Sequence, residues 1–197
     1  MLPDPHMNSN NSTNEGRGEQ KQASVKEMRE RARKEVSQGA VTPAYGADPE
    51  VVCEKLNEAL ATELLCSLRY KRHYFMATGL ASDSVKAEFL EHAKQEEGHA
   101  DKLAERIVQL GGEPDFNPAN IASKSHAEYV EGNSLREMIY EDLVAERVAI
   151  QSYSALLEFL DGKDPVTYHL IREILSVEEE HAEDMVSLLQ GLPTAEH

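Results

Sequence analysis

The stretch QEEGHADKLAERI, residues 95–107, places Glu96 and His99 three residues apart within a segment of helical periodicity. A second such pair, Glu178 and His181, lies in SVEEEHAEDM, residues 176–185. With 27 glutamates and eight histidines in 197 residues, about one Glu-x-x-His is expected by chance. A single pair therefore says little, and it is the presence of two that favours a functional interpretation.

Each pair has a further glutamate on the preceding predicted helix. Glu63 lies 33 residues before Glu96, and Glu146 lies 32 residues before Glu178. The segments around them, EALATELLCSLRY (58–70) and EDLVAERVAIQSY (141–153), share Glu at the first and sixth positions, Leu at the third and Tyr at the thirteenth. The two halves of the chain look like copies of one helix pair.

Capping signals predict an all-α chain with four long helices. They begin at Asp48-Pro49, at Ser82 or Ser84, at Ser134-x-x-Glu137 and at Asp164-Pro165, and they end near Gly79, Gly111, Gly162 and Gly191. Two connections are short, whereas about twenty residues join the second and third helices, which predicts a four-helix bundle with a long crossover. Within the crossover, residues 117–130 are expected to form a short extra helix.

The bundle domain is expected to span residues 48–191, preceded by an N-terminal arm, residues 1–47. Residues 1–20 are polar and predicted to be disordered, and residues 23–38 are predicted to form a short charged helix ending at Gly39.

Apolar residues bracket the paired residues at helical spacing, so their side chains should face the core. Buried carboxylates need positive charge nearby, and no Lys or Arg lies on those stripes at the same level. Two divalent ions would supply it, and a mixed carboxylate and imidazole set suits iron or manganese. The predicted ligands are Glu63, Glu96, His99, Glu146, Glu178 and His181. The neighbouring Glu97, Glu179 and Glu180 are interpreted as solvated charges.

Composition limits the other possibilities. A formal net charge of −16 disfavours a nucleic-acid surface and favours cations as partners. No apolar run is long enough to span a membrane and no signal peptide is evident, so a cytoplasmic location is expected. Cys53 and Cys66 lie too far apart on one predicted helix to form a disulfide and are interpreted as buried thiols.

With these motifs, residues 48–190 resemble the ferritin-like di-iron proteins, and in particular the bacterioferritins and their Dps-like relatives. The resemblance implies a ferroxidase and iron-storage protein with an antioxidant role, in which two Fe²⁺ ions at the six ligands are oxidised by O₂ or H₂O₂. It places Tyr70 beside the metals as a catalytic residue. For its counterpart Tyr153 core packing is favoured, and His92 is either a secondary iron contact or a buried histidine.

Departures from the family pattern carry further expectations. Haem-binding bacterioferritins have Met directly after the second-helix metal glutamate, and this chain has Glu97 there, so no haem is expected. Only 16 residues follow His181, which together with the crossover helix favours a dodecamer over a 24-subunit shell. The alternatives are a di-iron oxidase or oxygenase acting on an organic substrate, and a DNA-protecting protein. DNA binding is disfavoured because residues 1–50 hold seven Lys or Arg against eight acids.

Overall fold

The computed structural model describes residues 24–79 and 82–192. Within these ranges the regular elements are all helical, which confirms the predicted fold class: α1 (Val25–Lys34), the 3-10 helix η1 (Val36–Gln38), α2 (Pro49–Met76), α3 (Ser82–Gln109), α4 (Pro118–Lys124), α5 (Leu135–Leu160) and α6 (Pro165–Gly191). The disorder expected for residues 1–20 lies outside the described residues. None of the described helices combines the length and the apolar character that crossing a membrane would require.

Three of the four long helices, α2, α5 and α6, begin at capping residues whose side chains accept hydrogen bonds from free backbone N–H groups. Asp48 caps α2 by accepting a hydrogen bond from the N–H of Glu50, and Asp164 caps α6 by accepting from the N–H groups of Val166 and Thr167. Ser134 caps α5 in the same way. The helix ends are less regular, because α2 stops at Met76, where Ala77 turns extended before Gly79.

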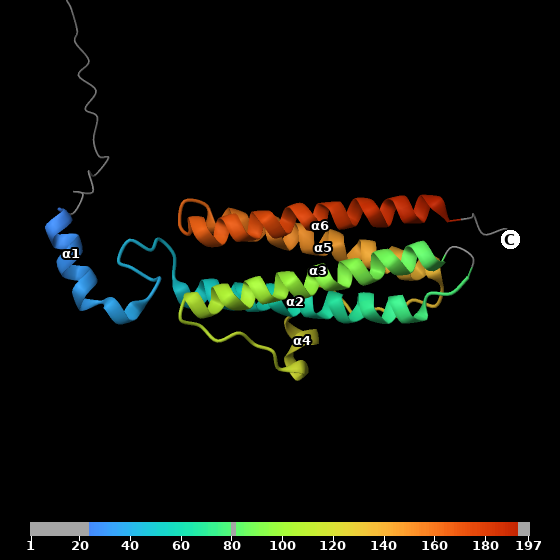
Figure 1. The fold of residues 1–197 in the computed structure, drawn as a ribbon, viewed down its shortest axis with the longest axis horizontal. Helices are drawn as coiled ribbons and strands as arrows, with labels where there is room; N and C mark the ends of the chain where they lie inside the picture. Colours follow the sequence, from blue (N-terminus) through green and yellow to red (C-terminus); the bar gives the residue numbers. More distant parts are fainter. Residues whose placement is uncertain (1–23, 80–81, 193–197) are drawn as a thin grey trace, which may run out of the picture. The chain divides into compact units, whose positions relative to one another are not determined.

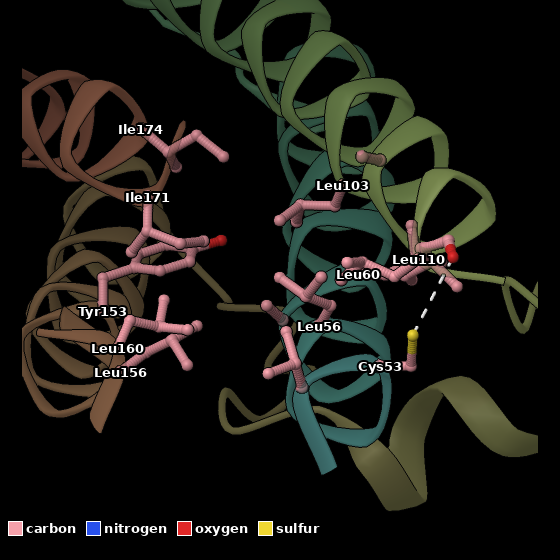
Figure 2. Packing of buried hydrophobic residues seen from close by; sticks show 14 of the residues in the cluster. Cys53, Leu56, Leu60, Leu103, Leu110, Tyr153, Leu156, Leu160, Ile171 and Ile174 are labelled. Atoms are coloured by element: carbon pink, nitrogen blue, oxygen red, sulfur yellow. Dashed lines mark hydrogen bonds between the residues drawn. The ribbon is translucent and has the colours of Figure 1, made fainter. Parts of the chain in front are cut away.

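The four long helices lie side by side as two hairpins, α2 with α3 and α5 with α6, joined by the crossover that carries α4 beside α2 (Figure 1). The expected crossover helix is present but short, capped by Asn117. Between the hairpins lies a core that includes Leu56, Leu103, Ile171 and Ile174, all fully buried (Figure 2).

Residues 41–47 contact the bundle, although the boundary predicted from the sequence assigned them to the N-terminal arm. Val41, Tyr45 and Ala47 pack against its core, and the Tyr45 hydroxyl donates a hydrogen bond to Asp164 Oδ2 at 2.6 Å. The helix α1, in contrast, has no buried side chain and forms part of a separate unit. Its start is a capping box, in which Ser24 and Glu27 bond each other's backbone N–H groups.

A buried charged network ties the crossover to α2 and α5. Arg69 and Asp142, both almost fully buried, form an ion pair with Nε and Oδ1 2.9 Å apart, and His73 Nδ1 lies 2.8 Å from the other Asp142 oxygen. Arg69 Nη1 also donates to the backbone carbonyl of Glu128 in the crossover, at 2.8 Å. The crossover is therefore held by side chains from the helices it passes.

Candidate metal centre

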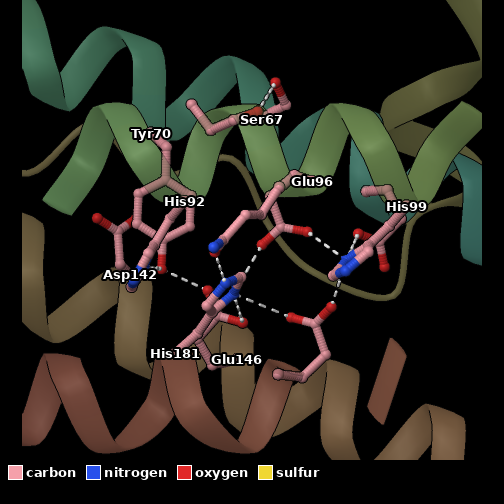
Figure 3. Close-up of polar contacts among 12 residues, drawn as sticks. Ser67, Tyr70, His92, Glu96, His99, Asp142, Glu146 and His181 are labelled. Atoms are coloured by element: carbon pink, nitrogen blue, oxygen red, sulfur yellow. Dashed lines mark hydrogen bonds and ion pairs between the residues drawn. The ribbon is translucent and has the colours of Figure 1, made fainter. Parts of the chain in front are cut away.

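The structure brings all six predicted ligands together in the interior of the bundle, at the level where the two hairpins face each other (Figure 3). Each is at most 4% exposed. Each of the four long helices contributes at least one of these residues: α2 supplies Glu63, α3 supplies Glu96 and His99, α5 supplies Glu146, and α6 supplies Glu178 and His181.

The ligands form two groups of four, and the two groups share Glu96 and Glu178. In one group His99 Nδ1 lies 3.2 Å from Glu63 Oε2 and 2.9 Å from Glu178 Oε1. In the other, His181 Nδ1 lies 3.4 Å from Glu96 Oε1, 3.4 Å from Glu178 Oε2 and 3.9 Å from Glu146 Oε2. In each group the ligand atoms lie within 4.8 Å of one another. Such a set can hold two ions, with two carboxylates positioned to bridge them.

Five buried ligand atoms lack a hydrogen-bond partner among the described residues: Glu96 Oε1, Glu146 Oε2, both carboxylate oxygens of Glu178, and His181 Nδ1. Leaving a buried polar atom unpaired costs about 1–3 kcal/mol, and more when the atom is charged. Cations bound among these atoms would satisfy all of them. The donor set therefore fits divalent metal ions of the kind that take oxygen and imidazole ligands.

When no metal is bound, protons on the side chains of the site offset part of the negative charge of its carboxylates. Burial raises the pKa values of Glu96 and Glu146 well above their usual range, and the negative charge of Glu178 adds to this. For His99 burial lowers the pKa, but the nearby carboxylates of Glu178 and Glu63 outweigh this effect and raise the value to about 11. Bound metal ions would displace these protons.

Gln95, which the sequence analysis did not identify, orients His181. The Nε2–H of His181 donates to Gln95 Oε1 at 2.5 Å, so in the neutral ring Nδ1 carries the lone pair that faces the carboxylates. The Gln95 amide nitrogen is directed to Glu91 Oε1 at 3.5 Å, which is consistent with this orientation. A hydrogen bond of this kind fixes the tautomer of a metal-binding histidine.

The two tyrosines mirror each other at the site. Tyr70 donates a hydrogen bond to Glu146, and Tyr153 donates one to Glu63. Both rings are buried, and that of Tyr153 belongs to the apolar core, as expected. Core packing is thus only part of its role, because its hydroxyl also holds a predicted ligand.

The remaining candidates lie around this centre. His92 is 2% exposed, its ring stacks on His181 with centroids 4.0 Å apart, and burial followed by the charge of His181 lowers its pKa to about 4. Cys53 and Cys66 are buried free thiols, and burial raises the pKa of Cys66 well above its usual range. Glu97 points away from the site and forms a surface ion pair with Lys71.

A pocket of about 370 Å³ lies near the site and is lined mainly by residues of α2 and α5. Its lining includes Ala59, Thr62, Ala149, Tyr153 and Leu156. Because Tyr153 bonds Glu63, one wall of the pocket is in direct contact with a predicted metal ligand.

Comparisons with known proteins agree with this geometry. The family model of the Ferritin-like domain matches residues 53–195. The chain is 35% identical over 153 residues to the DNA protection during starvation protein of Pyrococcus furiosus, covering 76% of this chain and 82% of that one. It is 31% identical over 149 residues to a bacterioferritin of Brucella melitensis, covering 74% and 86% respectively.

Among solved structures, a dodecameric thioferritin described as the bacterioferritin-related protein of Bacteroides fragilis matches with a TM-score of 0.71 and 27% identity, covering 84% of this chain and 94% of that one. Dps from Thermosynechococcus elongatus matches with a TM-score of 0.69 at 21% identity over 74% of this chain and 93% of its own, which supports the fold alone. With two helical hairpins enclosing a paired carboxylate and histidine cluster, and with a family match over most of its length, the chain belongs to the ferritin-like family.

Proposed function

We propose that this protein is a ferroxidase that binds two Fe²⁺ ions at the six-residue centre, oxidises them and contributes to iron storage. The observation that carries the proposal is the pair of four-ligand groups sharing Glu96 and Glu178. Two Fe²⁺ substrates held by shared ligands can release two electrons together. These electrons and two protons reduce O₂ to H₂O₂, or reduce H₂O₂ to two waters.

Anaerobic titration with Fe²⁺ tests the binding step. We expect the wild type to bind at least two ions per chain at the centre, and the Glu96→Ala, Glu178→Ala double variant to lose both together with rapid oxidation. The matched control is the Glu97→Ala, Glu179→Ala double variant, which removes two exposed acids one residue away. Saturation of the wild type below two ions, or unchanged oxidation in the first variant, would contradict the proposal.

Tyr70 is proposed to protect the reaction from one-electron side products. Its hydroxyl bonds Glu146, so a phenol that gives up an electron can pass its proton to that carboxylate. We expect Tyr70→Phe to bind iron normally but to release more radicals per iron oxidised, with either O₂ or H₂O₂ as oxidant. Spin trapping measures the radical yield. If neither radical yield nor turnover changes, Tyr70 serves only to position Glu146.

The proposal includes assembly into a homo-oligomer, and a dodecamer is the form we favour. The Bacteroides fragilis relative is described as dodecameric. Several large apolar side chains are exposed on α2 and α5, among them Leu68 (54%), Phe75 (76%) and Tyr140 (56%). Large apolar side chains at these positions are candidates for burial in contacts between subunits.

The pocket beside Tyr153 supports a second candidate function, oxidation of a small organic substrate. Its volume lies within the range of about 300–1,000 Å³ that is usual for ligand sites. Iron added in repeated aerobic pulses separates the two functions. A ferroxidase that stores iron accumulates a ferric core in proportion to the iron supplied, whereas an oxygenase saturates at the iron in its centre.

DNA protection is a third candidate function, suggested by the name of the Pyrococcus furiosus relative. The described arm helix α1 carries five basic residues, Lys26, Arg29, Arg31, Arg33 and Lys34, against two acids, Glu27 and Glu30. It is a short basic element on a chain that is strongly acidic as a whole. With a net charge of −16 for the chain, we expect no retardation of plasmid DNA in a gel at physiological salt. Retardation that disappears at higher salt would favour the DNA-protecting function.

A further inference from the structure

A second, smaller group of metal-ligating side chains lies beside the centre. Glu88 and His92 are one turn apart on α3, and Asp184 reaches them from α6. His92 Nε2 is 3.4 Å from Asp184 Oδ2 and 3.9 Å from Glu88 Oε2. The imidazole is buried, whereas the two carboxylates are about half exposed, at 44% and 47%. Ions can therefore reach the group from solvent.

The hydrogen bonds of His92 leave Nε2 facing two acceptors. Tyr70 gives its only hydroxyl proton to Glu146, so the Tyr70 oxygen accepts the hydrogen bond from His92 Nδ1, 3.3 Å away. In the neutral imidazole the lone pair is then on Nε2, which faces Asp184 and Glu88. Three electron-pair donors converge there without a proton among them, and a cation satisfies all three.

The internal repeat shows that this group is not a by-product of the bundle architecture. Glu96 and Glu178 are 82 residues apart, as are His99 and His181. At the same offset, the positions that correspond to Glu88, His92 and Asp184 hold Leu170, Ile174 and Lys102. Ile174 is fully buried in the apolar core, so the fold accepts an aliphatic residue at that position. The polar group is therefore present at one of the two positions between α3 and α6 that the repeat relates, and absent from the other.

We propose that Glu88, His92 and Asp184 form a third metal site, which takes a divalent first-row ion from solvent next to the centre. Two carboxylates neutralise one such ion, and water can complete its coordination on the open side. At a bond length of about 2.1 Å, two ligands of one ion are about 3.0 Å apart at right angles and about 3.4 Å apart at the tetrahedral angle, so small side-chain movements suffice.

The site would act as a waiting position for Fe²⁺, and this role rests on the proposed ferroxidase function. His92 links the two sites physically, because its ring stacks on that of His181 (Figure 3). Its Nε2 lies on the side of Glu88 and Asp184. Binding itself does not depend on the oxidation chemistry and can be tested without it.

Anaerobic equilibrium dialysis of the full chain with Co²⁺, which is not oxidised under these conditions, counts the ions. We expect Asp184→Asn and Glu88→Gln each to bind one ion fewer per chain than the wild type. The matched controls are Glu183→Gln on α6 and Glu105→Gln on α3, both exposed acids on the same helices, and both should bind as many ions as the wild type. Equal stoichiometry in wild type and Asp184→Asn, or equal losses in the controls, would overturn the proposal.

Two further measurements separate this inference from the proposed function. The Glu96→Ala, Glu178→Ala double variant should retain the ion that Asp184→Asn loses, seen as a Co²⁺ absorption band that disappears when Asp184→Asn is added. In Fe²⁺ oxidation, Asp184→Asn should raise KM about tenfold, the scale on which loss of a group around a metal weakens its binding, and leave kcat within about twofold. If the wild type and every variant other than Glu96→Ala, Glu178→Ala bind two ions per chain, the third site is contradicted while the proposed ferroxidase centre is supported.

Discussion

At the scale of single residues, the geometry of the candidate centre depends also on side chains that do not belong to it but hydrogen-bond its members, such as Gln95. The clustering of the six candidate ligands could be predicted because their spacing repeats in the two halves of the chain. Gln95 could not, since nothing in its sequence context distinguishes it from any polar helix residue. Its role becomes evident only when packing brings His181, 86 positions away, within hydrogen-bond distance.

Replacing Gln95 should weaken metal binding without removing a ligand. In Gln95→Leu the His181 ring loses the acceptor that fixes its tautomer, and we expect the affinity for one of the two ions to fall about 10–100-fold. Competition with a chromophoric chelator measures this. The control is Gln151→Leu, because the Gln151 side chain donates a hydrogen bond to the carbonyl of Arg147 on its own helix. If both variants bind alike, the Gln95 bond does not set the tautomer.

Metal binding should release protons. His99, whose pKa is raised to about 11, holds a proton at neutral pH when no metal is bound, and burial shifts the pKa values of Glu96 and Glu146 in the same direction. The ions must displace such protons. Affinity should therefore rise with pH, in the direction expected for competition between protons and metal. Adding Zn²⁺ to protein in weak buffer with a pH indicator should acidify the solution. No acidification by the wild type beyond that of the Glu96→Ala, Glu178→Ala variant would contradict this protonation scheme.

At the scale of helices, most of the fold follows from the capping residues. The starts at Asp48, Ser134 and Asp164 were predicted correctly because an N-cap is a local interaction between neighbouring residues. The Arg69–Asp142 network was not predicted, because its partners lie 73 positions apart and one of them contacts the irregular backbone of the crossover. Long-range polar contacts of this kind leave no periodic pattern.

Asp164 joins three elements and should be sensitive to acid. It caps α6, accepts from Tyr45 and forms a buried ion pair with Arg106, with Nη2 3.2 Å from Oδ2. Burial raises its pKa, but hydrogen bonds from Thr167 and Tyr45 and the charge of Arg106 outweigh this, so the pKa lies below its usual value. The stabilisation is therefore fully present above the unfolded-state pKa of about 3.9 and is lost as the pH falls through the folded-state value.

We expect Asp164→Asn to lower the free energy of unfolding by about 3–5 kcal/mol at neutral pH, since Arg106 is left buried and unpaired. The difference from the wild type should begin to shrink below about pH 4, where the unfolded chain takes up the proton, and it should be lost as the pH falls through the lower folded-state pKa. Urea unfolding at pH 7 and pH 3 measures both values. Asp161→Asn, at an exposed position before the same turn, is the control. A difference that persists unchanged at pH 3 would show that charge is not the cause.

At the scale of the whole molecule, the exposed apolar side chains of α2 and α5 predict self-association. A dodecamer of this 22.0 kDa chain has a mass of about 264 kDa, and a 24-subunit shell has about 528 kDa. We expect mass photometry to show the smaller particle, and Leu68→Glu combined with Phe75→Glu to yield smaller species, because both side chains are more than half exposed in the single chain. The control pair Val108→Glu and Val166→Glu replaces exposed residues on α3 and α6. A wild type that remains a monomer would shift the balance towards the oxygenase.

The burial of Cys66 affects how readily this cysteine would be oxidised by the peroxide used or formed under the proposed function. A thiol reacts with peroxide as the thiolate, and a thiol kept protonated is a poor target. Cys66 is 2% exposed within a small apolar cluster, and the carboxylates Glu96 and Glu146 add to the effect of burial in keeping its proton in place. The carboxylates that would attract iron thus also help to keep the Cys66 thiol protonated, and burial limits the access of oxidants to it. Under the proposed function, a subunit could turn over many times without accumulating sulfenic acid in its core.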